Sequence, residues 1–396
     1  MGSIQYHIRE NWVFCPLPWY SLTWQKNGNI GICCMHTLVE PWYELGNIKN
    51  TPMSELWNSP KIKELRIRMI EWKASDYCKW CYKKEENNVE SMRQRYMKRL
   101  SQDIDTYIKY TDTHGYYTGP IKQLDLRLSN LCNLACRMCN GNSSTKRIPL
   151  DKKLGISQKR EYTKEPYDTE IFWDDIKNWS SIEEIKFAGW EPLINPTFYK
   201  LMLLLQEKGI SQNIHFTFLT NLTVLPENIQ EIIQKSRAVD FNISIDGYGA
   251  SYEYIRIGAK WEKLEENLHK LLELRNYYTW ISIAFIPTIQ RDNIYDFPKL
   301  YLFAKKQNIY INIKPLIAPE FLNIQNIDEE EKEKIELFYR VCIKRYSLLY
   351  PEIEKDFESI IYFMNRKISQ EQHRNEYREK TKIIDDFAQN SFFNES

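Results

Sequence analysis

Six short apolar runs alternate with helical stretches in the middle of this chain, and this alternation limits its fold more than any other feature. The runs lie at 123–129, 184–188, 213–220, 241–246, 280–286 and 310–316. The helical stretches include 197–208, 226–236, 260–277 and 293–307. Strands that alternate with helices predict an α/β fold with a parallel sheet. Because six units are fewer than the eight of a complete β/α barrel, we expect an open or partial (β/α)6 barrel over residues 121–317.

Regions of different composition flank this predicted barrel. Residues 10–95 are rich in Cys, Trp and Pro and lack long periodic runs, which predicts a small module that needs a metal to hold it together. Residues 96–120 form a connector, and residues 318–396 form a charged, helical C-terminal extension. Residues 147–180 are a polar insertion after the first β/α unit, and we expect them to be helical in part.

A cysteine triplet directly follows the first predicted strand. Cys132, Cys136 and Cys139 have the spacing C-x-x-x-C-x-x-C. Reactive loops of β/α folds lie at the C-terminal ends of the strands, so this position suits catalysis. Three thiolates can bind three irons of a cubane cluster and leave the fourth iron open. Two other interpretations fit the spacing alone: three buried free cysteines on one face of a helix, and a zinc site completed by a distant ligand.

The triplet, with Met138 before its last cysteine, resembles the signature of the radical S-adenosylmethionine (SAM) superfamily, and the resemblance covers about residues 120–317. It implies an enzyme in which a 4Fe–4S cluster binds SAM, cleaves it reductively to a 5′-deoxyadenosyl radical and so abstracts a hydrogen atom from the substrate. In such an enzyme the cofactor supplies the reactivity, while the protein supplies orientation and excludes competing reactions. The resemblance also implies an electron donor, such as a flavodoxin, a ferredoxin or another reductase.

Segments at the ends of later strands are similar to the SAM contacts of this superfamily. Ala-Gly-Trp-Glu-Pro at 188–192 resembles the G-G-E-P motif, which meets the amino group of SAM there. Arg256 resembles the arginine that pairs with the SAM carboxylate, a task that suits the fork of a guanidinium. Ser244 resembles the position that contacts the ribose, whereas Trp190 departs from the pattern because a second glycine is usual there. The SAM contacts implied by the resemblance are Met138, Gly189, Trp190, Glu191, Asn221, Ser244 and Arg256.

A second group of cysteines lies near the N-terminus. Cys15, Gly28 and Cys33 have the pattern C-x12-G-x4-C, and Cys78 and Cys81 form C-x-x-C. These segments resemble the SPASM and twitch modules that hold auxiliary 4Fe–4S clusters in radical SAM enzymes, although such modules more often follow the barrel. The resemblance implies one auxiliary 4Fe–4S cluster, with four cysteine ligands. The alternative is a structural zinc site on the same four thiolates.

The adjacent Cys33 and Cys34 compete for one position in this group. If 29–34 form a strand, these two side chains point to opposite faces, so only one can readily serve as a ligand. The four-residue spacing from Gly28 favours Cys33.

Radical SAM enzymes with such modules often modify peptides, so we expect the substrate to be a ribosomally made peptide. The alternative enzyme interpretation is a dehydrogenase or epimerase of a small metabolite or a nucleotide-linked sugar. An interpretation of another class is a non-catalytic iron–sulfur or zinc-binding scaffold. The complete triplet and the matching strand-end residues argue against the scaffold.

Charge and hydropathy bear on the partners of the chain. Lys and Arg number 54 and Asp and Glu number 53, so the net charge of +1 gives no overall case for binding nucleic acid or a membrane surface. No apolar run reaches the ~20 residues of a membrane helix, and the N-terminus lacks a signal peptide pattern. We therefore expect a cytoplasmic protein, in which the nine cysteines serve metal or redox sites rather than disulfides.

Overall fold

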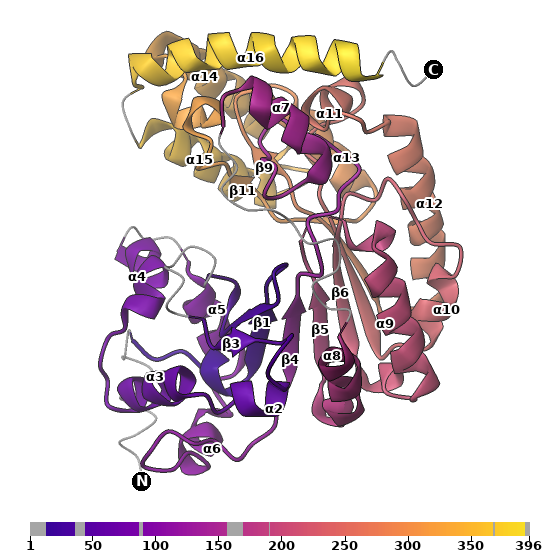
Figure 1. Cartoon of the computed structure of the whole chain (residues 1–396). Helices are drawn as coiled ribbons and strands as arrows, with labels where there is room; N and C mark the ends of the chain where they lie inside the picture. Colours follow the sequence, from indigo (N-terminus) through magenta and orange to yellow (C-terminus); the bar gives the residue numbers. More distant parts are fainter. Residues whose placement is uncertain are drawn as a thin grey trace.

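The computed structural model describes residues 13–35, 44–86, 90–156, 169–189, 191–366 and 369–392. A nine-stranded sheet runs through it in the order β10-β8-β7-β6-β5-β4-β1-β2-β3 (Figure 1). Six of these strands follow chain order and are mutually parallel, which confirms the predicted partial (β/α)6 barrel. They are β4 (Gln123–Leu126), β5 (Glu184–Phe187), β6 (His215–Thr220), β7 (Ala238–Ile243), β8 (Ile281–Phe285) and β10 (Tyr310–Ile311).

Helices cover the outer face of these strands (Figure 1). They are α9 (Pro196–Glu207), α10 (Ile229–Gln234), α12 (Trp261–Tyr277) and α13 (Phe297–Lys306). Phe187 and Phe218 meet the ring of Phe198 on α9 edge-on, with centroid distances of 5.0 and 5.6 Å. Because side chains alternate along a strand, Asp125 and Lys186 lie on the opposite, concave face. The barrel thus presents polar residues inward and apolar residues to its helices.

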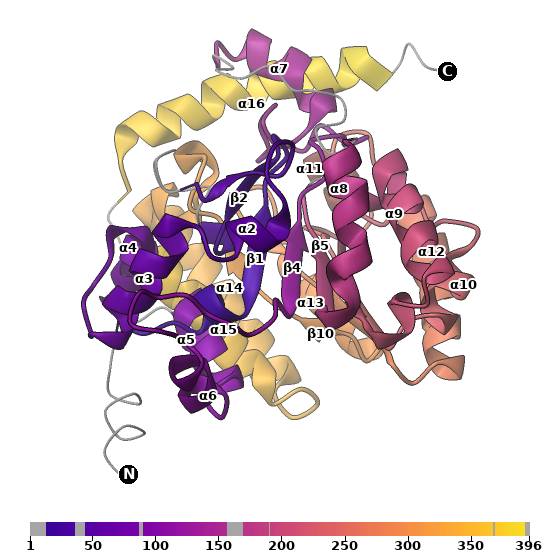
Figure 2. The ribbon, with the colours of Figure 1, turned by 60° about the horizontal axis from the view of Figure 1, so that its bottom comes forward.

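The N-terminal module extends the same sheet. Its strands are β1 (Ser21–Trp24), β2 (Asn29–Gly31) and β3 (Gly46–Asn47). β1 pairs in parallel with β4, so that Leu22 lies opposite Leu124, and β2 and β3 follow in antiparallel order. Figure 2 shows the helices of the module gathered beside this edge of the barrel. These helices are α2 (Met53–Leu56), α3 (Pro60–Ile70), α4 (Lys79–Glu86), α5 (Met92–Arg99) and α6 (Ile104–Lys109).

Side chains from both parts fix the joint between the module and the barrel. Tyr20 donates a hydrogen bond of 2.9 Å to Glu184 Oε1, and Arg99 pairs with the same carboxylate. Trp24 on β1 packs edge-on against Phe172 and Trp179 at 5.4 and 5.5 Å. Buried apolar residues of the module and the barrel belong to one continuous cluster. The two parts therefore share a sheet and a core.

The C-terminal extension is helical, as predicted. It contains α14 (Glu329–Tyr346), α15 (Glu352–Asn365) and α16 (Glu371–Phe392). Both ribbon views place α16 across the end of the molecule that also carries α7 (Ile148–Lys153), and Figure 1 shows α11 (Ala250–Ile255) below it. A second apolar cluster lies under α16, formed by Ala135, Leu150, Ile257, Leu316, Phe321, Leu322, Ile384 and Phe387. None of the helices in the described ranges is both long enough and apolar enough to cross a membrane.

The remaining elements are short. The insertion after β4 contains α7 and α8 (Glu170–Asp175) within its described part, so it is helical in part as expected. A separate pair of strands is formed by β9 (Thr288–Ile289) and β11 (Lys314–Pro315). The 3-10 helices are η1 (Leu17–Trp19), η4 (Asp76–Cys78), η5 (Thr145–Arg147), η6 (Ile176–Ser181), η7 (Pro192–Ile194), η8 (Ser211–Asn213), η9 (Glu320–Leu322) and η10 (Ile324–Asn326).

Two predicted strands differ from the observed ones. The run 241–246 is displaced, because β7 begins at Ala238 and ends at Ile243, where the chain leaves the sheet toward the site. The run 310–316 is split into β10 and β11, which belong to different sheets. In both segments the end of each strand is set by backbone hydrogen bonds to neighbouring strands. The apolar pattern of the sequence does not reveal these bonds.

Candidate active site

The cysteine triplet lies in the loop that leaves β4. Cys132 and Cys136 are buried and Cys139 is half-buried. The loop pairs with the end of α11, because the amides of Ala135 and Arg137 donate to the carbonyls of Ile257 and Ile255, each at 2.9 Å. The three thiols lie close enough to influence one another's charge. The structure therefore brings the predicted triplet together at the C-terminal end of the first barrel strand.

Two of the three thiols of the triplet, Cys132 and Cys139, resist ionisation by themselves. Burial, reinforced by Cys136, raises the pKa of Cys132 to about 12. A hydrogen bond between Cys139 and Cys136 lowers the pKa of Cys136 and raises that of Cys139. Metal ions neutralise neighbouring thiolates and so remove this penalty. The donor set therefore fits a metal cluster.

Glu191 joins the ends of two strands beside the triplet. Its buried carboxylate accepts hydrogen bonds from Thr220 Oγ1 at 2.7 Å, from the amide of Leu193 at 3.1 Å and from the amide of Asn221 at 2.6 Å. Burial raises the pKa of Glu191 to about 7, although these bonds lower it. Asn221 Nδ2 lies 3.9 Å from Cys132 Sγ. Two of the predicted SAM contacts thus adjoin the first cysteine.

Arg256 approaches the triplet from the loop after α11. It interacts electrostatically with Cys136 and Cys139, and its Nη2 lies 2.7 Å from Asp246 Oδ2. Within the described part of the chain, the buried Nε of Arg256 has no hydrogen-bond acceptor. This orphaned donor is an observation in favour of an anionic ligand, because buried donors are otherwise paired.

The other predicted SAM contacts lie around this centre. Ser244 directly follows β7, and its amide donates to the carbonyl of Thr220 at 2.8 Å. Met138 is half-buried and packs against both apolar clusters. Gly189 has a φ of +98°, and a Cβ there would lie 3.2 Å from Cβ of Arg127, so the position suits glycine. Trp190 lies outside the described residues.

Sequence reasoning missed Asp246. This carboxylate is buried, faces Arg256 and accepts a hydrogen bond of 2.7 Å from the amide of Thr288. Its signal was present, because Asp246 follows Ser244 by two residues at the end of the same predicted strand. A carboxylate at a strand end is a candidate ion-pair partner for an arginine that the resemblance places in the same site.

The four N-terminal cysteines also form one group. Cys15 interacts electrostatically with Cys78 and Cys81, and Cys33 interacts with all three. Burial is the main cause of the raised pKa of Cys15, Cys33 and Cys78, and the pKa of Cys78 rises to about 12. The group lies where η4, α4 and the β2 hairpin meet.

Cys34 has different surroundings. Burial raises its pKa, followed by the effect of Asp125, while Lys186 and Arg127 oppose the rise. These three partners belong to β4, β5 and the residue after β4, on the concave side of the barrel. Cys33 therefore interacts with all the other cysteines of the group, whereas Cys34 interacts mainly with charged side chains of the barrel and less with Cys81.

The described residues contain no three His, Cys, Asp or Glu side chains that converge to hold a single metal ion. A zinc site needs four ligands around one ion. In a cubane each thiolate binds a different iron, so the ligands are spaced more widely. Four thiolates can hold either a closed zinc site or a closed cubane.

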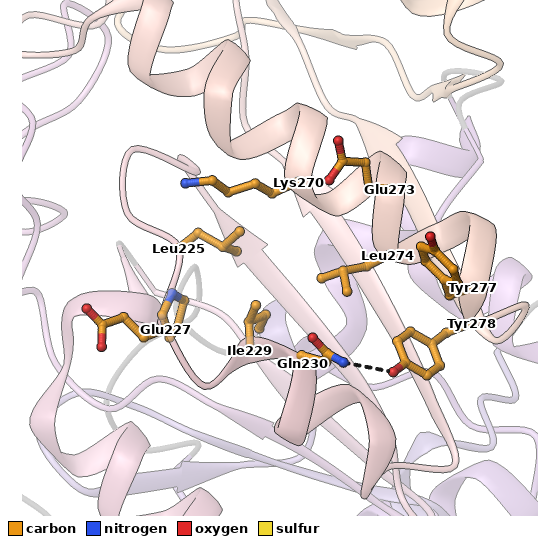
Figure 3. Close-up of a pocket in the computed structure, with 10 residues that line it drawn as sticks. Leu225, Glu227, Ile229, Gln230, Lys270, Glu273, Leu274, Tyr277 and Tyr278 are labelled. Atoms are coloured by element: carbon orange, nitrogen blue, oxygen red, sulfur yellow. Dashed lines mark hydrogen bonds between the residues drawn. The ribbon is translucent and has the colours of Figure 1, made fainter.

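One cavity of the described structure lies away from this centre. It is bounded by α10, the segment before it and the C-terminal half of α12, on the outer helical layer (Figure 3). Tyr278 closes one side and accepts a hydrogen bond of 3.2 Å from Gln230. The cavity contains none of the predicted site residues.

Two families match this chain. The Radical SAM superfamily matches residues 126–300, which include the triplet and every implied SAM contact. The iron-sulfur cluster-binding domain SPASM matches residues 15–82, which include all four N-terminal cysteines of the group.

The chain is also similar to individual proteins. It is 26% identical over 262 residues to the radical SAM cyclopropyl synthase TigE of Paramaledivibacter caminithermalis, covering 64% of this chain and 51% of that protein. It is 24% identical over 211 residues to molybdenum cofactor biosynthesis protein 1 of Homo sapiens, covering 53% and 30%. The chain thus spans about half the length of the first relative and less of the second.

Solved structures with a weaker likeness include anSMEcpe with bound AdoMet and Streptococcus suis SuiB bound to S-adenosylmethionine. The first has a TM-score of 0.41 and 16% identity, and the match covers 63% of each chain. The second has a TM-score of 0.39 and 12% identity, and the match covers 72% of this chain and 63% of that one.

Proposed function

Because this chain is a radical SAM enzyme that carries an iron–sulfur cluster-binding SPASM domain ahead of its barrel, we propose that it abstracts a hydrogen atom from a ribosomally made peptide. The radical SAM domain implies a 4Fe–4S cluster and SAM, and the SPASM domain implies an auxiliary cluster. When bound, the cluster and SAM supply a 5′-deoxyadenosyl radical that takes a hydrogen atom from carbon. The protein has to hold these groups, orient the substrate and exclude competing reactions.

In this proposal Cys132, Cys136 and Cys139 hold the cluster and leave one iron for SAM. Arg256 receives the SAM carboxylate, since its Nε lacks an acceptor among the described residues. Glu191 receives the amino group, because three hydrogen bonds leave part of its carboxylate available. The remaining SAM contacts are Met138, Gly189, Trp190, Asn221 and Ser244. Cys15, Cys33, Cys78 and Cys81 hold the auxiliary cluster.

The observation that carries the peptide proposal is the group of charged side chains on the concave face of the barrel, next to Cys34. Asp125 forms ion pairs with Arg127 Nε and Lys186 Nζ, each at 3.6 Å. Cys34, next to the auxiliary ligand Cys33, faces the same three side chains. A surface with both signs of charge suits a peptide, whose amides and charged side chains need polar partners. The cyclopropyl synthase relative supports a product with a cyclopropyl group.

The test begins with anaerobic reconstitution of the protein with iron and sulfide. Dithionite and SAM should yield 5′-deoxyadenosine, and adding a peptide encoded beside the gene should increase the yield. A peptide deuterated at carbon should transfer deuterium to the 5′-deoxyadenosine. Cys132→Ala should abolish the product, whereas Cys342→Ala, which removes a buried cysteine of α14 outside both groups, should retain it.

A small-molecule substrate is the second candidate, and the similarity to molybdenum cofactor biosynthesis protein 1 favours it. It would replace the peptide proposal if only small metabolites or nucleotide-linked sugars stimulated SAM cleavage and carried the label. If protein with a full complement of iron and sulfide forms no 5′-deoxyadenosine, the enzyme interpretation is refuted and the non-catalytic scaffold remains.

A further inference from the structure

We propose that Arg137 is a positioning residue that ties the cluster-binding loop to the C-terminal helix α16, so that α16 controls where Cys136 and Cys139 lie. The inference rests on the proposed role of the triplet as the SAM-cleaving site. Arg137 directly follows Cys136 and precedes Cys139 by two residues. Any displacement of its backbone therefore moves two proposed cluster ligands.

The side chain of Arg137 is held on three sides. It is fully buried, and its Nε lies 2.8 Å from Asp292 Oδ2 while its Nη1 lies 2.6 Å from Asp385 Oδ1. The guanidinium also lies over the ring of Tyr254, 4.1 Å from the centroid. Asp385 belongs to α16, whereas Arg137 belongs to the loop after β4, so this pair connects segments 248 residues apart. A charge buried this completely is stable only with such partners.

A second contact couples the same helix to the same arginine. Tyr377, also on α16, donates a hydrogen bond of 2.7 Å to Asp292 Oδ1. Ile384 and Phe387 on the helix join the apolar cluster that contains Ala135, directly before Cys136. The helix therefore fixes Arg137 directly through Asp385 and indirectly through Asp292.

The backbone of the loop transmits this position to the cysteines. The Arg137 amide donates to the Ile255 carbonyl at 2.9 Å, next to Arg256. On the other side, Arg147 Nη1 donates to the carbonyls of Cys136 and Arg137 at 2.7 and 3.1 Å. Because these bonds hold the backbone of the loop on both faces, a displacement of the Arg137 backbone would shift them. Cys136, Cys139 and Arg256 thus depend on one network.

The chemistry of the pair favours arginine over lysine. Arg137 reaches two carboxylates with two different nitrogens, and a single ammonium cannot reproduce this fork. We therefore expect that loss of one carboxylate partner of Arg137 makes the loop less rigid but leaves the iron–sulfur cluster bound. The affinity for SAM should fall more than the iron content, because SAM must reach the open iron and Arg256 at the same time.

The test compares Asp385→Asn with Asp386→Asn in the full chain. Asp386 is the neighbouring, exposed residue of α16, so both variants lose one charge from the same helix turn. The Asp385 side chain is itself 36% exposed, so its replacement should leave the fold intact. After anaerobic reconstitution, iron content, the SAM dissociation constant and the electron paramagnetic resonance (EPR) spectrum of the reduced cluster with and without SAM are measured.

Asp385→Asn should retain wild-type iron content, bind SAM about tenfold more weakly, which equals about 1.4 kcal/mol, and show a smaller SAM-induced change of the EPR spectrum. Asp386→Asn should match the wild type in all three measurements. In an Arg137→Lys background, Asp385→Asn should add little, because residues of one network do not act additively.

Two results would overturn the inference. One is wild-type SAM affinity and EPR response in Asp385→Asn. The other is an undiminished effect of Asp385→Asn when Arg137 is already replaced. Failure of the proposed function is distinguishable, because the Cys132→Ala variant would then lose neither iron nor the SAM-induced EPR change relative to the wild type.

Discussion

Asp246 and Arg256 form a buried ion pair in which Oδ2 and Nη2 lie 2.7 Å apart. Both side chains lie beside the triplet, and Asp246 is also fixed by the amide of Thr288. The pair explains how the protein keeps a guanidinium in a buried site before any anionic ligand arrives. It holds the arginine in place while leaving Nε without an acceptor among the described residues.

Asp246→Asn should therefore destabilise the protein strongly. The variant leaves the Arg256 charge buried without its counter-charge, which costs roughly 3–5 kcal/mol. Urea unfolding followed by circular dichroism measures this loss. Glu231→Gln is the control, because Glu231 pairs with Lys235 on an exposed helix face and such pairs contribute at most about 0.5 kcal/mol. Equal losses in the two variants would contradict the prediction.

Cys33→Ala and Cys34→Ala should differ in iron content. Cys33 groups with three other cysteines, whereas Cys34 faces Asp125, Lys186 and Arg127. If one closed cubane is lost with Cys33, iron falls from about eight to about four per chain. Cys34→Ala should keep about eight irons. Each variant is the control for the other, because the two cysteines are adjacent. A loss of iron in Cys34→Ala and not in Cys33→Ala would identify Cys34 as the ligand.

Lys314 should make the free energy of unfolding increase with pH in the alkaline range. Burial lowers its pKa to about 8, and the positive charges of Arg95, Lys84 and Lys186 add to this, opposed by Glu90. In the unfolded chain the pKa of lysine is about 10.4. Between these values the unfolded state binds more protons, so the free energy of unfolding rises as pH increases.

Lys314→Met should remove this rise and increase stability at neutral pH. The measurement is the urea midpoint at a series of pH values from neutral to about 10. Lys263→Met, which removes an exposed lysine of α12, should keep the wild-type slope. An unchanged slope in Lys314→Met would refute the assignment.

Gly189→Ala should destabilise the loop that leads to Glu191. The residue combines a φ of +98° with a Cβ position only 3.2 Å from Arg127 Cβ, so strain and a close contact add. A non-glycine residue in such a conformation costs about 1–3 kcal/mol. Gly209→Ala is the matched control, since its φ is +65° but its nearest neighbour lies 4.0 Å away. Thermal unfolding should show the larger loss for Gly189→Ala.

Much of the barrel was predictable, because strand and helix periodicity are local properties of the sequence. The predicted helix 260–277 is α12, Trp261–Tyr277, and the predicted strand 184–188 is β5, Glu184–Phe187. The same holds for the order of the site residues, since parallel strands bring their C-terminal ends together. Cys132, Glu191 and Asn221 meet for that reason, whereas Arg256 reaches them from the end of α11.

Contacts between distant segments were not predictable. The pairing of Leu22 with Leu124 depends on strand edges that have no signature in either segment alone. The ion pair of Arg137 with Asp385 connects residues 248 positions apart, and no local pattern in the sequence links the two. Asp246 was visible at a strand end, but only the fold shows that it faces Arg256.

The parallel pairing of β1 with β4 has a consequence for the evolution and engineering of the chain. A partial barrel has two open edges, and an open edge with buried apolar residues such as Leu124 and Leu126 invites aggregation. Here β1 pairs with one of those edges, and β2 and β3 of the same chain extend the sheet further. The N-terminal module, which matches an iron-sulfur cluster-binding domain, therefore also protects one edge of the barrel, and a chain truncated at residue 120 would expose that edge.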